Sequence, residues 1–325
     1  MTDQSRISAP AGKSLIERAT RGLDLNGLIA RPLGLPQAKS PVARNPAVDE
    51  PVQVPEPIPA APITDSAPQP AAQAVEAPQF KNRRHPIDRE RLREQGLIVP
   101  EGAVTTLLEE FRIVKRQLLV QAADLRRQKA GPSAQRILIS SPHPGEGKTY
   151  CALNLALSIA AEKESEVLLV DADFAKPSIL SVLGLPGGPG LMDALMDESI
   201  DVLDCVLGTD IPGLRVLPAG DTSNHDSEYL ASSRTAKVLE RLTQGAPHRM
   251  VIFDSPPALA ASPAAELAKY VGQAVVIVRA DKTGRGALED SISLLSGCPN
   301  VQLLLNAAQF SPSGRRFGSY YGYKG

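Results

Sequence analysis

Residues 142–149 combine the residue types that bind phosphate groups. Within this stretch, Gly145 and Gly147 are followed by Lys148 and Thr149. Glycines allow backbone N–H groups to close around phosphate oxygens at the start of a helix. A lysine amine neutralises the phosphates, and a threonine hydroxyl is a ligand for Mg²⁺. The spacing is that of a P-loop, although proline stands at the first position, where the pattern requires glycine.

The neighbouring segments indicate that this loop lies in the setting that phosphate binding needs. A β-branched and aliphatic run over residues 136–141 predicts a strand, and apolar residues at helical spacing over 150–162 predict a helix. The loop therefore joins a strand to a helix, as a P-loop does. We expect the loop to bind ATP through Pro144, Gly145, Glu146, Gly147, Lys148, Thr149 and Tyr150.

Two further apolar strands end in aspartate. One leads into Asp171 and Asp173, and the other leads into Asp254. The carboxyl ends of parallel strands meet at one edge of a sheet, beside the P-loop. A Mg²⁺·nucleotide complex needs acidic groups in its coordination shells at that place. We therefore expect Mg²⁺ to be held near Thr149, Asp171 and Asp254.

The rest of the core alternates continuous aliphatic strands with helices. This alternation predicts an α/β fold, with a doubly wound, mostly parallel sheet covered by helices on both faces, as in P-loop NTPases. The remaining strands are expected at 214–217, 274–278 and 301–305, and the remaining helices at 88–95, 104–128, 191–196, 227–243, 263–270 and 287–296.

Composition divides the chain into four parts. Residues 1–35 contain a short amphipathic patch, which is either a docking helix that folds on a partner or a fraying segment. Residues 36–85 are rich in proline and alanine and predict a disordered linker. The P-loop domain is expected over 86–310, and a flexible tail over 311–325.

Overall composition excludes several classes of function. With 35 basic and 36 acidic residues and no tryptophan, the chain has neither the charge nor the aromatic platforms for nucleic acid. Cys151, Cys205 and Cys298 have no metal-ligand spacing and suggest a reduced, cytoplasmic compartment. No apolar run approaches the roughly 20 residues needed to span a bilayer, so we expect membrane association only through a partner.

The tail and the first long helix carry candidate regulatory residues. Half of the six tyrosines lie in the tail, which has no apolar periodicity and suits either a phosphoryl acceptor or a docking motif. In the helix over 104–128, charged residues recur at three-residue steps on one face, for intrahelical pairing or for contact with a neighbouring subunit. The tail residues are Tyr320, Tyr321 and Tyr323. The helix residues are Glu109, Arg112 and Lys115.

The order of these motifs resembles that of the bacterial P-loop tyrosine kinases of the exopolysaccharide co-polymerase system. The resemblance covers residues 104–325 and is greatest to the stand-alone tyrosine autokinases of exosortase-linked loci. It rests on PHPGEGKT, VLLVDADFAKPS, VIFDSPP, the LPAG turn and the terminal tyrosines. It implies an ATP-dependent autokinase that phosphorylates its tail tyrosines in trans within an oligomer and regulates exopolysaccharide synthesis and export.

The resemblance also implies roles for single residues. Asp171 would contact Mg²⁺ and orient or deprotonate the tyrosine, with Asp173 in support, and Asp254 would order the water shell of the metal. With Lys148, these form the expected catalytic group. Asn306 resembles an adenine-contacting asparagine. Glu109, Arg112 and Lys115 resemble an ExxRxxR oligomerisation element with lysine in its last place, and Ala175 replaces the usual arginine of DxDxR.

The expected partners are an inner-membrane polysaccharide co-polymerase as activator, further copies of the chain, and a protein-tyrosine phosphatase as counter-enzyme. The protein would then lie in the cytoplasm, peripheral at the inner membrane. Two other readings stay open. One is a partition-type ATPase, although the second lysine of that class is missing from residues 141–143. The other is a nucleotide-binding scaffold that has lost transfer.

Overall fold

The computed structural model describes residue 80 and residues 83–163, 165–221 and 225–308. The amphipathic patch, nearly all of the predicted linker and the tail tyrosines lie outside the described residues. Among those described, no helix combines the length and the apolar character that crossing a bilayer requires.

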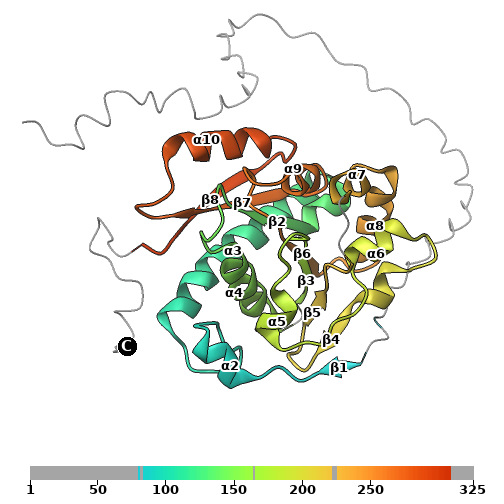
Figure 1. The fold of residues 1–325 in the computed structure, drawn as a ribbon. Coiled ribbons are helices and arrows are strands. Elements are labelled where there is room, and N and C mark those ends of the chain that lie inside the picture. Colours follow the sequence, from blue (N-terminus) through green and yellow to red (C-terminus); the bar gives the residue numbers. More distant parts are fainter. Residues whose placement is uncertain (1–79, 81–82, 164, 222–224, 309–325) are drawn as a thin grey trace, which may run out of the picture. The chain divides into compact units, whose positions relative to one another are not determined.

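One sheet organises the described residues (Figure 1). Its strand order is β1-β4-β5-β3-β6-β2-β7-β8, and every neighbouring pair is parallel except β4 and β5. The strands are β1 (Arg84–His85), β2 (Arg136–Ser140), β3 (Glu166–Asp171), β4 (Leu207–Thr209), β5 (Leu214–Leu217), β6 (Arg249–Asp254), β7 (Gln273–Arg279) and β8 (Val301–Asn306).

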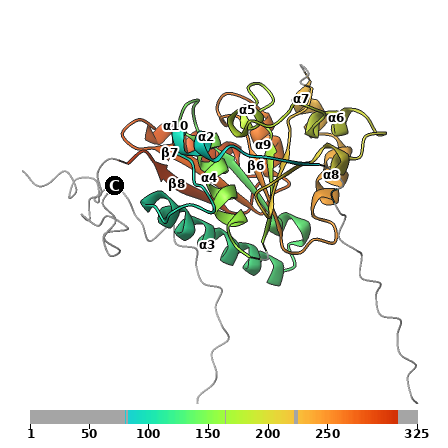
Figure 2. The ribbon, with the colours of Figure 1, turned by 90° about the horizontal axis from the view of Figure 1, so that it is seen from below.

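Helices cover both faces of the sheet because successive side chains of its central strands point to opposite sides. In β2, Ile137 and Ile139 pack into one apolar core, while Leu138 packs into the other. Figures 1 and 2 show α3 and α4 on the first side, and α8 and α9 on the second. The helices are α2 (Arg89–Glu94), α3 (Thr106–Arg127), α4 (Lys148–Ala160), α5 (Ile179–Leu183), α6 (Leu191–Met196), α7 (Asp226–Leu230), α8 (Ser233–Thr243), α9 (Pro263–Ala268) and α10 (Arg285–Leu294).

This arrangement confirms the predicted doubly wound, mostly parallel sheet. Three short elements were not predicted: β1, β4 and α5. The helix expected over 227–243 was wrong as a single element, since the chain forms α7 and then α8. The break follows from Ser232, whose backbone is extended, and Thr235 folds back with its hydroxyl to the carbonyl of Tyr229 at 3.0 Å.

Lys115 does not belong to the exposed charged face expected on α3. Its side chain is buried, its Nζ donates to the carbonyl of Ser158 at 3.0 Å, and it forms an ion pair with Glu162 at 2.8 Å. Glu109 and Arg112 instead pair with each other on the outer side of the helix. The lysine therefore joins α3 to the end of α4.

The three cysteines are buried and free. Burial raises the thiol pKa of Cys151 to about 12 and that of Cys205 to about 11, and it also raises the pKa of Cys298. These side chains act as small apolar core residues.

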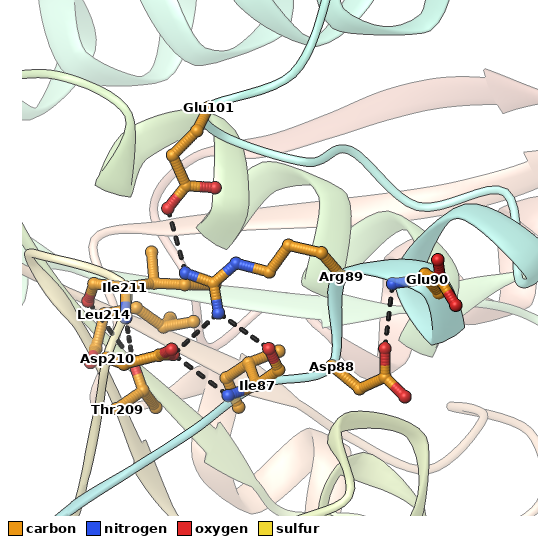
Figure 3. Close-up of polar contacts among 9 residues, drawn as sticks. All are labelled: Ile87, Asp88, Arg89, Glu90, Glu101, Thr209, Asp210, Ile211 and Leu214. Atoms are coloured by element: carbon orange, nitrogen blue, oxygen red, sulfur yellow. Dashed lines mark hydrogen bonds and ion pairs between the residues drawn. The ribbon is translucent and has the colours of Figure 1, made fainter.

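Residues 83–102, called the strap here, cross the sheet edge before α3 begins. Figure 3 shows how Arg89 fixes the strap: its guanidinium bonds Asp210 at 2.7 Å, Glu101 at 2.9 Å and the carbonyl of Ile87 at 2.7 Å. β1 belongs to the strap and pairs with β4, and its two residues are the last two of the predicted linker.

Aromatic and ionic contacts hold the chain just before the strap. The ring of Phe80 lies 4.9 Å from the guanidinium of Arg215 and 4.2 Å from that of Arg249. Both arginines also bond the carboxylate of Glu166, at 2.9 and 3.0 Å. This cluster lies where β3, β5 and β6 begin, at the opposite end of these strands from the aspartates.

Apolar burial should stabilise the strap more than its ion pairs do. Leu92 is fully buried, so Leu92→Ala is expected to lower the free energy of unfolding by about 3 kcal/mol. Arg89→Ala should cost about 1 kcal/mol or less, because partly exposed ion pairs contribute little. Urea unfolding of both variants measures the difference, and an equal loss in the two would contradict this ranking.

Candidate functional site

The loop between β2 and α4 has the backbone of a phosphate-binding turn. Gly145 has a φ of +76° and Gly147 has a φ of +99°, both in the left-handed region that favours glycine. Gly147 caps the N-terminus of α4. A Cβ atom at position 147 would clash with Nδ2 of Asn306, so that side chain would have to move.

Proline at position 142 is compatible with this geometry. The described residues with positive φ do not include Pro142, so the glycine of the usual pattern is not needed for its conformational freedom there. The loop is instead fixed by its own polar groups. The hydroxyl of Ser141 donates to the carbonyl of His143 at 2.8 Å, and the N–H of His143 donates to Oε2 of Glu146 at 2.9 Å.

The two aspartate-bearing strands are neighbours in the sheet, and Asp171 pairs in register with Asp254. The hydroxyl of Thr149 donates to Oδ2 of Asp254 at 2.6 Å. The carboxylate of Asp171 accepts the N–H groups of Ser178 at 2.9 Å and of Ile179 at 3.0 Å. The P-loop helix and both strand ends thus meet at one point.

Burial shifts the acids of this cluster. It raises the pKa of Asp254 to about 7 and that of Asp171 to about 6. It raises the pKa of Asp173 as well, and the neighbouring charge of Lys148 opposes the rise at both Asp173 and Asp254. The cluster therefore favours a ligand that brings positive charge.

One carboxylate oxygen is available to contact a cation. Oδ1 of Asp254 is buried and has no hydrogen-bond partner among the described residues. Those residues contain no group of three or more His, Cys, Asp or Glu that could hold a metal alone. An ion here would take further oxygens from water and from phosphates, which is how Mg²⁺ usually binds beside one or two carboxylates. Thr149, Asp171 and Asp254 fit this use.

Binding of Mg²⁺·nucleotide is expected to weaken as pH falls from about 7.5 to about 5.5, because Asp254 and Asp171 then take up protons that a cation must displace. The ligand-free protein should behave oppositely. Its raised pKa values lie above the ordinary value of 3.8, so stability falls as pH rises from about 4 towards about 7. Calorimetry near pH 6 should show proton release on binding, and a pH-independent affinity would contradict the assignment.

The other expected site residues have separate surroundings. The hydroxyl of Tyr150 donates to the carbonyl of Gly96 in the strap at 2.9 Å. Nδ2 of Asn306 donates to the carbonyl of Glu146 at 2.9 Å. Pro144 is exposed, as are Ala175 and Lys176. The three residues of the expected oligomerisation element, Glu109, Arg112 and Lys115, line a groove of about 950 Å³ on α3.

Sequence analysis missed Arg279 and Thr283, which also touch the P-loop. Nη1 of Arg279 donates to the carbonyl of Gly145 at 3.0 Å, and the hydroxyl of Thr283 donates to Oε1 of Glu146 at 2.6 Å. Arg279 is the last residue of β7, which neighbours β2, and Thr283 lies in the connection between β7 and α10. The rule that identified the aspartates, attention to strand ends, would have marked Arg279 as a candidate but not its contact with the loop.

Comparison with known proteins places the chain among named relatives. No family model matches it. A tyrosine-protein kinase, Ptk of Acinetobacter johnsonii, is 32% identical over 181 residues, which is 55% of this chain and 24% of that protein. The chain is homologous to bacterial tyrosine-protein kinases. Another of these kinases, YwqD of Bacillus subtilis, is 29% identical over 67% of this chain and 86% of its own length.

A solved structure agrees with this homology. The chimerical protein CapA2B2 has a TM-score of 0.51 and 26% identity, and covers 66% of this chain and 98% of its own. The chain matches only 24% of the length of Ptk, and also 24% of the length of another relative, EpsB of Ralstonia nicotianae. The resemblance drawn from the motifs is confirmed at the level of these tyrosine-protein kinases.

Proposed function

We propose that the chain is an ATP-dependent protein-tyrosine autokinase that uses Mg²⁺ and phosphorylates tyrosines of its own tail. The observation that carries this proposal is the bond from Thr149 to Asp254, beside Asp171 and behind a left-handed glycine loop. Homologues named as tyrosine-protein kinases support tyrosine as the acceptor. The acceptors are Tyr320, Tyr321 and Tyr323, which lie outside the described residues.

Each residue of the cluster would contribute positioning or charge, which is most of what phosphoryl transfer requires. The loop amides and Lys148 hold the triphosphate. Thr149, Asp171 and Asp254 would hold Mg²⁺, which would neutralise phosphate charge when bound. Asp171, oriented by three backbone N–H groups and with a pKa of about 6, accepts the proton of the phenol, and Asp173 supports it.

Transfer would occur between copies of the chain and control their assembly. The groove on α3, with Glu109 and Arg112 at its wall, is the proposed contact between subunits. A tail with two or three phosphates gains several negative charges that repel one another. Phosphorylation would therefore loosen the oligomer, and a phosphatase would restore it.

The proposed setting is exopolysaccharide synthesis and export. Residues 1–35 would dock on an inner-membrane co-polymerase, residues 36 onward would act as a tether, and the kinase would stay peripheral at the cytoplasmic face. The absence of net basic charge in the sequence supports a protein partner rather than nucleic acid.

Mass spectrometry after incubation with Mg²⁺·ATP tests this function. The tail should gain phosphotyrosine, and a Tyr320/Tyr321/Tyr323→Phe variant should not. Mixing this variant with an Asp171→Asn chain that keeps its tyrosines tests transfer in trans. ATP turnover with an unmodified tail, at all protein concentrations and with membrane vesicles from the source cell, would instead indicate a partition-type ATPase. Nucleotide binding without turnover would indicate a scaffold.

A further inference from the structure

Three side chains from the neighbouring strands β7 and β8 and from the β7–α10 connection bond the outer side of the P-loop. Arg279 donates to the carbonyl of Gly145 at 3.0 Å, and Asn306 donates to the carbonyl of Glu146 at 2.9 Å. Thr283 donates to the carboxylate of Glu146 at 2.6 Å. Arg279, Thr283 and Asn306 are called the clamp here.

The clamp fixes which way the loop amides point. A trans peptide is planar, so its C=O and N–H groups point in opposite directions, and the described residues contain no cis peptide bond. The bond from Arg279 turns the carbonyl of Gly145 outward, so the N–H of Glu146 points inward. The bond from Asn306 does the same for the N–H of Gly147. Inward N–H groups at a helix N-terminus are the donors that phosphate oxygens need.

The third member of the clamp acts through a buried carboxylate. Glu146 is 1% exposed, and it accepts both the hydroxyl of Thr283 and the N–H of His143. The hydroxyl oxygen of Thr283 in turn accepts the backbone N–H of Arg279 at 2.9 Å, while its proton is donated to Glu146. A buried carboxylate needs such partners. Glu146 thereby ties two positions of the loop to the β7–α10 connection.

We infer that Arg279, Thr283 and Asn306 are positioning residues that hold the P-loop amides in the orientation for nucleotide phosphates. The inference rests on the proposed function only in taking a phosphate group as the ligand. Both polar atoms of the Asn306 side chain are engaged, since Oδ1 accepts the N–H of Ala307 at 2.8 Å. Asn306 therefore acts on the loop through Glu146, and its contact with adenine stays a prediction.

Comparing two ligands separates these roles. Calorimetry measures the dissociation constants for Mg²⁺·ADP and Mg²⁺·pyrophosphate. Pyrophosphate has no adenine, so its affinity depends on the phosphate contacts alone. Thr283→Val and Asn306→Ala should weaken both ligands by about tenfold, the effect of one lost hydrogen bond. Thr283→Ser keeps the hydroxyl and should bind like the wild type. Arg285→Ala is the matched control, since that exposed arginine pairs with Glu289 of its own helix.

Several results would overturn the inference: unchanged pyrophosphate binding in Thr283→Val, loss of ADP affinity alone in Asn306→Ala, or equal losses in Thr283→Val and Thr283→Ser. Thermal unfolding without ligand checks that the variants fold. If Thr283→Val does not fold, Arg279→Gln provides the same test at an exposed residue. Wild-type protein that binds both ligands without tail phosphorylation would refute the kinase and leave the clamp standing. Wild-type protein that binds neither would refute both.

Discussion

Replacing Lys148 by methionine is expected to slow phosphoryl transfer to the tail by about 10³-fold, the effect of removing a preorganised charge from a transition state. Lys148 is 7% exposed at the first position of α4, and its charge opposes the rise that burial causes in the pKa of Asp173 and Asp254. Methionine keeps the apolar stem and removes the charge. Single-turnover transfer from Mg²⁺·ATP, followed by mass spectrometry, measures the loss.

Lys269→Met is the control for this experiment, because that exposed lysine pairs with Glu266 on α9, away from the loop. Its rate should equal that of the wild type. A Lys148→Met enzyme that loses ATP affinity but keeps its maximal rate would show that the lysine binds ground state and transition state equally. That result would contradict the role proposed for it.

Asp254→Asn is expected to raise stability and to abolish function together. The wild-type carboxylate is fully buried, its pKa is raised to about 7, and its Oδ1 lacks a partner among the described residues. At about pH 8 the ligand-free variant should gain about 1–2 kcal/mol in the free energy of unfolding, because the buried charge is gone. The gain is well below the full value of the pKa shift, since the new amide is also poorly paired.

The same variant should lose Mg²⁺-dependent transfer by about 10²- to 10³-fold, because the amide cannot hold the metal. Its stability advantage should shrink as pH falls from about 7 towards about 4, because the wild-type carboxyl is then neutral in the folded state while it is still ionised in the unfolded state. Urea unfolding across this range measures the trend. A ligand-free wild type that is more stable than the variant at about pH 8 would contradict the assignment.

The site was predictable as far as it depends on strand ends. Asp171 and Asp254 each follow an aliphatic run, and the parallel register then places them side by side. The contacts of the clamp depend on tertiary structure. Arg279 and Asn306 lie more than a hundred residues from the loop in sequence, and only the strand order β2-β7-β8 brings them to it. No local pattern contains that order.

Lys115 was placed on the wrong face of its helix for a different reason. Phe111, Lys115 and Leu118 lie at helical spacing on one stripe, so periodicity alone would have placed the lysine inward. Because lysine is charged, it was instead predicted to lie on the exposed face. The long apolar stem allows burial while the amine reaches the carbonyl of Ser158 and the carboxylate of Glu162. The break between α7 and α8 was also missed, because residues 231 and 232 are alanine and serine rather than glycine or proline.

The buried cysteines make the protein convenient for spectroscopy. A thiolate is the reactive form of cysteine, and burial keeps Cys151 and Cys205 protonated far above neutral pH. A cysteine introduced at an exposed position should therefore accept a maleimide dye selectively, with the native thiols left in place. The sequence has no tryptophan. The fluorescence of such a dye, placed on the loop or the strap, would therefore be recorded without a tryptophan signal.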